Sequence, residues 1–166
     1  MTILYELAVL GAPSDAVVRE LESCIAASIA PFGLRLGDEV GWNVRPNSFD
    51  PAQTKSAAAV FFGAPGAPAG NVESLLRRNI PVLPVVSDIS KVHEEIPSML
   101  RALNCLAYNV AGVQRTSTAL LECAGLLPRQ RRVFVSYRRD EARQAALQLF
   151  DALSARLFDV FLDTHG

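Results

Sequence analysis

Residues 3–10, Ile-Leu-Tyr-Glu-Leu-Ala-Val-Leu, are followed by Gly11-Ala12-Pro13. The apolar run predicts a mostly buried strand, and the glycine and proline end it. Ser14 or Asp15 can then cap a helix. The apolar positions of that helix recur at helical spacing and predict one face packed on a sheet: Val18, Leu21, Ile25 and Ile29.

The same pattern of a strand followed by a helix recurs through residues 1–127. The further predicted strands are Leu34–Leu36, Ala57–Phe62, Ile80–Val86 and Cys105–Val110, and the further predicted helices cover 71–79, 90–103 and 116–126. Residues 37–55 are rich in turn-forming residues, and we expect a long irregular loop there. Alternating strands and helices predict an α/β domain with a parallel sheet and helices on both faces. Five strands in a domain of this length favour the flavodoxin-like, doubly wound order 2-1-3-4-5.

The composition is that of a globular protein. Half of the 166 residues are apolar, and the net formal charge is −1, so nothing favours binding to a nucleic acid or to an acidic membrane. No apolar run is long enough to span a bilayer and no secretory signal is present, and we therefore expect a cytoplasmic protein. Cys24, Cys105 and Cys123 are odd in number and lie far apart in apolar segments, which favours buried free thiols in a reducing cytosol over a metal site. His93 and His165 are isolated from other ligand-type residues, so no metal site is expected.

A second pattern follows a short basic linker at residues 128–132. Residues 133–140, Val-Phe-Val-Ser-Tyr-Arg-Arg-Asp, predict a strand that runs into a polar turn, and residues 160–163, Val-Phe-Leu-Asp, predict the next strand after a helix. In this order and at this distance, the two motifs resemble the first two strands of a Toll/interleukin-1 receptor (TIR) domain. The resemblance is to prokaryotic TIR-domain proteins. We expect residues 133–166 to be the N-terminal portion of a truncated TIR domain, a partial β-α-β unit.

The resemblance implies a function that the composition does not. TIR domains share the flavodoxin-like architecture and associate with one another. In many bacterial members they cleave NAD at the nicotinamide bond, often in antiphage defence. In similar domains, the strand edge that corresponds to Ser136, Tyr137, Arg138 and Arg139 helps to form the nicotinamide-nucleotide pocket. The plainer interpretation, which we favour for this chain, is that Ser136 caps the next helix and the arginines are solvated.

The family's catalytic glutamate lies on the helix after the third strand, which we expect beyond Gly166. The resemblance therefore implies that NAD is a substrate of a longer protein, an NAD nucleosidase. The chain itself is expected to be inactive and to require no cofactor.

The two parts of the chain also suggest an internal repeat. A shift of 125 positions places Asp140 on Asp15 and Asp163 on Asp38, and the two acids of each pair are 23 residues apart. This spacing favours a TIR-like domain at 1–127 in tandem with a TIR domain. The alternative is that all flavodoxin-like units have similar spacing.

Two candidate sites lie within residues 1–127. Glu73 is just inside the helix after the third predicted strand, where the resemblance places a catalytic glutamate. The tryptophan that precedes it in the family is replaced by small or rigid residues at 67–70, so a first-turn acid that complements the helix dipole is the better explanation. Gly11 and Ser14 lie between a strand and a helix, where backbone N–H groups can bind a nucleotide phosphate; ordinary turn chemistry is the default.

Together these patterns predict a sensor or assembly domain that controls a downstream TIR domain. Its expected partners are other copies, through TIR-like surfaces, and a small nucleotide, but neither nucleic acid nor membrane. The alternatives are a nucleotide-processing enzyme that uses Glu73 and a purely structural oligomerisation module.

Overall fold

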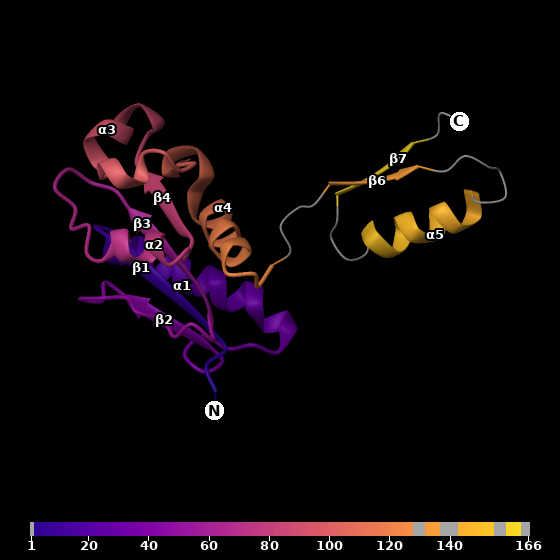
Figure 1. The fold of residues 1–166 in the computed structure, drawn as a ribbon, viewed down its shortest axis with the longest axis horizontal. Coiled ribbons are helices and arrows are strands. Elements are labelled where there is room, and N and C mark those ends of the chain that lie inside the picture. The colour runs from indigo at the N-terminus through magenta and orange to yellow at the C-terminus, as the bar shows by residue number, and fades with distance from the viewer. Residues whose placement is uncertain (1, 128–131, 137–142, 155–158, 164–166) are drawn as a thin grey trace. The chain divides into compact units, whose positions relative to one another are not determined.

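The structure is a computed structural model that describes residues 2–127, 132–136, 143–154 and 159–163. The chain divides into two compact units, residues 1–127 and 128–166, and each has a sheet of its own (Figure 1). Within the described residues, no helix is both long and apolar enough to cross a membrane.

The first unit is built on a five-stranded parallel sheet. Its strands are β1 (Tyr5–Gly11), β2 (Val40–Val44), β3 (Ser56–Phe62), β4 (Val82–Val86) and β5 (Leu106–Ala107). Their order is β2-β1-β3-β4-β5, and every neighbouring pair is parallel. The predicted flavodoxin-like, doubly wound α/β fold is confirmed.

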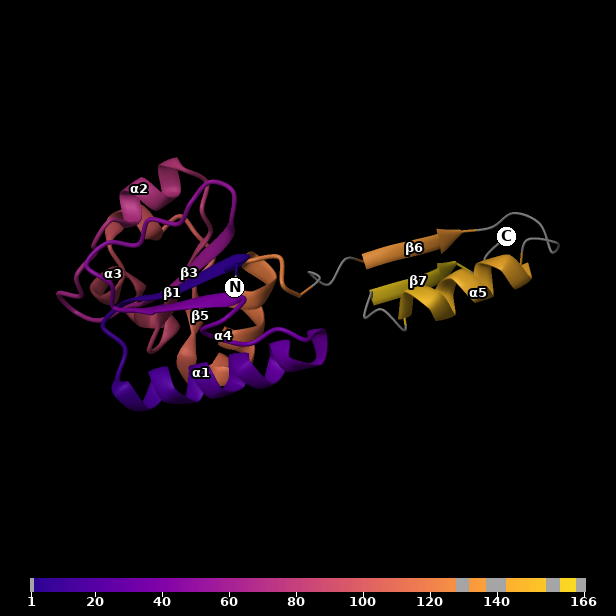
Figure 2. The same ribbon diagram turned by 90° about the horizontal axis from the view of Figure 1, so that it is seen from below.

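Helices cover both faces of this sheet (Figure 2). On one face lie α1 (Asp15–Ile29) and α4 (Tyr108–Cys123); on the other lie α2 (Val72–Arg77) and α3 (Val92–Glu95). Short 3-10 turns complete the unit at Ala30–Phe32, Ile89–Lys91 and Ser98–Leu100. Side chains of each strand alternate between the faces, so Leu7 and Val9 pack on the α1 side and Ala8 and Leu10 on the α2 side.

Helix α1 forms as its sequence predicts. The Ser14 hydroxyl accepts a hydrogen bond from the Val17 backbone N–H at 3.2 Å, which caps the first turn. The buried residues of the helix are the four apolar residues at helical spacing: Val18, Leu21, Ile25 and Ile29. Local capping and periodicity therefore suffice to define this element.

The second strand lies further along the chain than predicted. Leu36 makes only an isolated bridge to Val40, and the strand β2 begins at Val40, so the prediction of a strand at Leu34–Leu36 was wrong. Trp42 is in this strand and not in a loop. The physical reason is that Gly37 turns the chain with a φ of 91°. In the strand that follows, every second residue packs on the α1 face: Val40, Trp42 and Val44.

The predicted strand Cys105–Val110 was also too long. Only Leu106–Ala107 pairs, with Val85 and Val86, and Tyr108 already begins α4. In this register Pro84 lies opposite Cys105 and has no N–H, which fits the later start of β5, whereas the early end of β5 follows from the helix that begins at Tyr108. Helix α4 is kinked at Gly112, which has a φ of 62°, and Pro97 stands between α3 and the next 3-10 turn of the predicted helix 90–103.

The connection from β2 to β3, residues 45–55, contains no helix. Phe49 is 2% exposed and packs in the core on the α2 face. The Asn71 side chain donates to the Phe49 carbonyl at 2.6 Å and accepts from the Phe49 N–H at 3.1 Å. Arg78 donates to the Asp50 carboxylate and, at 2.5 Å, to the Pro51 carbonyl. The Phe49 ring and the side chains of Asn71 and Arg78, the residues that flank α2, thus hold the connection on the sheet.

The second unit consists of β6 (Arg132–Ser136), α5 (Arg143–Ser154) and β7 (Asp159–Asp163). Its two strands are parallel, as expected for a β-α-β unit. Within α5, Ala146 is buried, whereas Ala145 and Leu149 are exposed.

The proposed repeat does not extend to the second strand of each unit. Val133 pairs with Val160, 27 residues later, whereas Leu7 pairs with Trp42, 35 residues later. A shift of 125 positions would place the second strand of the first unit at 34–38, where β2 does not lie. The connection between the first two strands is longer in the first unit than in the second, so the spacing of the two units agrees only up to the first helix.

Candidate functional site

Ligands of doubly wound sheets bind outside the carboxyl ends of the strands, at the point where the strand order reverses. Here that point lies between β1 and β3, because β2 and β3 flank β1 on opposite sides. The loops that meet there are residues 11–14, which lead into α1, and residues 63–71, which lead into α2. Gly11, the last residue of β1, begins the first of these connections and Ser14 ends it, while Glu73 lies in the first turn of α2, after the second.

Gly11 allows β1 and β3 to approach closely at this edge. Its φ is 79°, and a Cβ atom at this position would lie 2.2 Å from the Phe62 carbonyl oxygen. The next residue, Ala12, donates its N–H to that same oxygen at 2.9 Å. Gly11 therefore has a steric role that no other residue type can fill without moving the backbone.

Ser14 and its neighbours are held by protein groups. Besides capping α1, the loop is clamped by Arg45, whose guanidinium donates to the Pro13 carbonyl at 2.6 Å and to the Asp15 carboxylate at 2.9 Å. Arg45 comes from the end of β2 and has a φ of 46°. The clamp fixes the turn for which ordinary turn chemistry was the default expectation and phosphate binding the alternative.

Glu73 lies in the first turn of α2, as predicted, and its side chain is exposed. Among the residues that the structure describes, no group donates a hydrogen bond to its carboxylate or pairs with it. Helix α2 covers the opposite face of the sheet from the helix that Ser14 caps. The structure therefore does not assemble Glu73 and Ser14 into one group of side chains.

A polar cluster at the carboxyl end of β4 was not predicted. Glu95 is 7% exposed, and its carboxylate accepts from the Ser87 N–H at 2.8 Å and the Ser87 hydroxyl at 2.6 Å. Asp88 accepts from the Ser90 hydroxyl at 2.6 Å, the Ser90 N–H at 2.9 Å and the Asn109 amide at 2.8 Å. The sequence Ser-Asp-Ile-Ser at 87–90 is a signal for such a turn, whereas the burial of Glu95 has no local signal.

The hydrogen bonds to Asp88 make the stability of the fold depend on pH. Donation by the Ser90 side chain, then by the Ser90 backbone, holds the pKa of Asp88 below its usual 3.8. A lowered folded-state pKa stabilises the fold above pH 3.8, and this contribution is lost as the pH falls through the folded pKa. We expect Asp88→Asn to narrow the difference in melting temperature between pH 6 and pH 3. A scan of melting temperature against pH, with Asp38→Asn as the control, checks this expectation; an unchanged pH profile would contradict it.

Comparisons with known proteins give no relative for this chain. No family model, curated protein or solved structure matches it. A functional assignment depends on the geometry and on the sequence motifs.

The TIR-like motif of the second unit is described only in part. Ser136 is the last residue of β6, while Tyr137, Arg138 and Arg139 lie outside the described residues. No group of three or more His, Cys, Asp and Glu side chains that could hold a metal ion occurs in the part of the chain that the structure describes. The three cysteines are not in disulfides, but each is partly exposed, so the prediction that they are buried was wrong.

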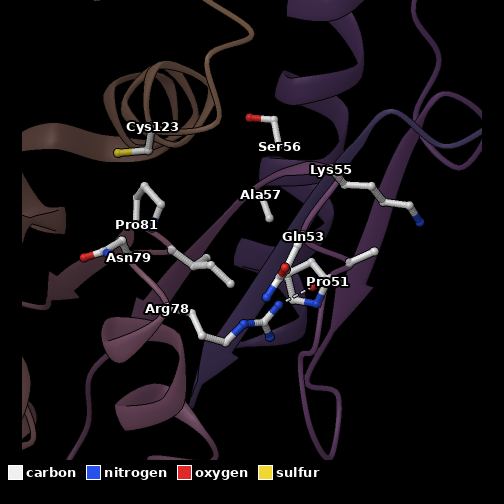
Figure 3. A pocket seen from close by; sticks show the side chains of 11 residues that line it. Pro51, Gln53, Lys55, Ser56, Ala57, Arg78, Asn79, Pro81 and Cys123 are labelled. Carbon is white, nitrogen blue, oxygen red and sulfur yellow. Dashed lines mark hydrogen bonds between the residues drawn. The ribbon is translucent and has the colours of Figure 1, made fainter.

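Two cavities of the first unit lie away from the carboxyl edge. One of about 400 Å³ lies at the amino ends of β3 and β4, and its lining includes Ser56, Arg78 and Pro81 (Figure 3). A second, about 580 Å³, lies between α1 and residues 34–36. These two cavities are therefore distinct from the carboxyl edge at which the fold class predicts a ligand site.

Proposed function

We propose that residues 1–127 form a regulatory domain, with a sensing or assembly role, that controls a TIR domain beginning at residue 133. The observation that carries this proposal is that the polar side chains at the carboxyl edge of the sheet form hydrogen bonds with neighbouring protein groups. Ser14 caps a helix, Arg45 clamps its loop, and the Asp88 and Glu95 carboxylates accept hydrogen bonds from neighbouring residues. Groups committed to holding loops together suit a rigid recognition surface better than a reaction.

The TIR assignment itself comes from the sequence. Val133–Ser136 lies in β6 and Val160–Asp163 in β7, which are parallel strands joined through α5. This arrangement supports the first two strands and first helix of a TIR domain, and NAD cleavage in a longer protein in the cytoplasm is part of the proposal.

An enzymatic role for Glu73 is the second candidate. Catalytic carboxylates are held in position by neighbouring groups and shielded from water. Exposure of Glu73, without a hydrogen-bonding partner among the described residues, argues against this role.

We therefore expect the purified 166-residue chain to release no nicotinamide from NAD above the buffer blank. The reason is the exposed position of Glu73 and its separation from Ser14. Chromatographic detection of nicotinamide, with an active NAD glycohydrolase in parallel, measures this. Turnover by the unaltered chain that is lost in Glu73→Gln but kept in Glu94→Gln would assign the activity to residues 1–127.

Self-association is proposed to use the second unit. A unit of one helix and two strands is marginally stable alone. Leu147 and Leu149 on α5 are 41% and 49% exposed. A second copy of the chain, which offers the same apolar groups, is the partner proposed to cover them.

Sedimentation of residues 1–166 beside residues 1–127 tests this role. We expect the longer chain to form a dimer at high micromolar concentration and the shorter one, checked for folding by circular dichroism, to remain a monomer. Replacing Leu147 and Leu149 with Glu should shift the longer chain to the monomer. Val110→Asp, at an 85% exposed apolar position of the first unit, is the matched control. A monomeric 166-residue chain would exclude this mode of assembly.

A further inference from the structure

We propose that the cavity at the amino ends of β3 and β4 binds a small organic phosphate. The cavity measures about 400 Å³, a size typical of small-molecule sites. Its walls come from three separate segments of the first unit: residues 51–57, which include the start of β3, residues 78–81 and the end of α4 (Figure 3). Binding here is independent of the proposed control of a TIR domain, because it concerns the opposite edge of the sheet.

The charge of the lining favours an anion. Lys55 and Arg78 line the cavity, and none of the described Asp or Glu residues does. Glu6 pairs with Lys55 at 2.6 Å, and Asp50 pairs with Arg78, but neither acid belongs to the lining. The two acids therefore lie outside the cavity, while Lys55 and Arg78 belong to its lining.

Arg78 is the group that we assign to the phosphate. Its side chain is 28% exposed, and its orientation is fixed by the hydrogen bond to the Pro51 carbonyl. A guanidinium carries five N–H donors, of which the bonds to Asp50 and Pro51 use two, so donors remain for a ligand. Guanidinium groups bind phosphate oxygens through paired hydrogen bonds.

The ion pair with Asp50 does not prevent binding. The Asp50 side chain is 79% exposed, and pairs with an exposed partner contribute little to stability, so a phosphate can replace this carboxylate at small cost. Figure 3 shows the Gln53 side chain beside Arg78, where its amide can donate a further hydrogen bond. The same view shows the Lys55 amine extending away from Arg78, so Lys55 contributes positive potential rather than a shared contact.

The remaining walls define the rest of the ligand. Ala57, Ile80 and Pro81 offer apolar surface, and the Ser56 hydroxyl is used in a bond to the Ala124 carbonyl at 2.7 Å. Apolar walls beside a guanidinium suit a phosphate monoester with a compact, flat body. A nucleoside monophosphate has this chemistry.

The test compares AMP, inorganic phosphate and adenosine with the full 166-residue chain. Titration calorimetry and the melting temperature should both report binding of AMP, and a weaker effect of phosphate, but none of adenosine, because adenosine lacks the anion. Arg78→Gln should weaken AMP binding about tenfold or more, the effect expected for the loss of a charge-assisted hydrogen bond. Arg77→Gln, an adjacent exposed arginine outside the cavity, should bind as the unaltered chain does.

A second variant separates binding from folding. Arg78 also holds the 45–55 connection, so Arg78→Gln can lower stability by itself. Gln53→Ala removes an exposed side chain that makes no hydrogen bond within the described residues, and it should weaken AMP binding several-fold at unchanged melting temperature of the ligand-free chain. Alkylation followed by mass spectrometry locates the site: AMP should slow the labelling of Cys123 in the cavity wall and leave that of Cys24 on α1 unchanged.

Two results would overturn the proposal. One is the absence of any response to AMP and phosphate. The other is an equal response in the unaltered chain and in Gln53→Ala and Arg78→Gln, which would mean that Arg78 serves only to hold the connection. A chain that binds AMP here but does not associate or control a TIR domain would refute the proposed function alone.

Discussion

Gly11→Ala is expected to lower the free energy of unfolding by about 3 kcal/mol or more, at the upper end of the cost of a strained backbone position. The added Cβ would stand 2.2 Å from the Phe62 carbonyl oxygen, which is backbone and cannot rotate away. The positive φ of 79° adds the usual cost for a residue other than glycine. Urea unfolding followed by circular dichroism measures the change.

Gly66→Ala is the matched control. Gly66 has a similar φ of 74°, but a Cβ atom added there would meet no described atom within 4 Å beyond its chain neighbours. Its replacement should therefore cost only about 1 kcal/mol, from the backbone conformation alone. Equal losses in the two variants would show that the β1–β3 approach at Phe62 carries no special constraint.

Phe49→Ala is expected to cost about 3–5 kcal/mol, the range for removing a buried aromatic side chain. Phe49 is 2% exposed and lies in the core on the α2 face, under a connection that has no helix. Phe32→Ala, at a position that is 55% exposed, should cost under about 1 kcal/mol. Thermal unfolding of both variants checks the difference, and a mild effect at Phe49 would mean that the connection is held by Asn71 and Arg78 alone.

The parts of the fold that local sequence determines could be predicted. Helix α1 has a serine cap and apolar residues at helical spacing, and β3 is an uninterrupted apolar run between turns. Both were predicted close to their observed bounds. The parallel sheet followed from the alternation of strands and helices, and the strand order was predicted because five strands in a domain of this length favour the flavodoxin-like arrangement.

The second strand could not be placed in the same way. Leu34–Leu36 and Val40–Val44 are both short and apolar, and what selects the second is its pairing with β1, a contact 35 residues away. The irregular connection at 45–55 is likewise held by Asn71, 22 residues after its partner Phe49, and by Arg78, 27 residues after its partner Pro51. Local propensity carries no information on such partners.

The candidate sites also divide into those with a local sequence signal and those that depend on residues far apart in the chain. Gly11 and Ser14 were found because turn residues between a strand and a helix have a local signature, although their structural roles became visible only with Phe62 and Arg45 in place. The cavity that contains Arg78 has walls from segments up to 72 residues apart, from Pro51 to Cys123. No motif in the sequence marks a site assembled in this manner.

The connection at 45–55 also has a consequence for the order in which the chain folds. A helical crossover would gain hydrogen bonds as soon as its own residues came together, whereas this one is ordered by Asn71, 22 residues from Phe49. The entropy of closing that loop must be overcome before these contacts form. Residues 45–55 should therefore become ordered only after α2 has docked on β3, which makes them a late step of folding and the first part of the α2 face to open.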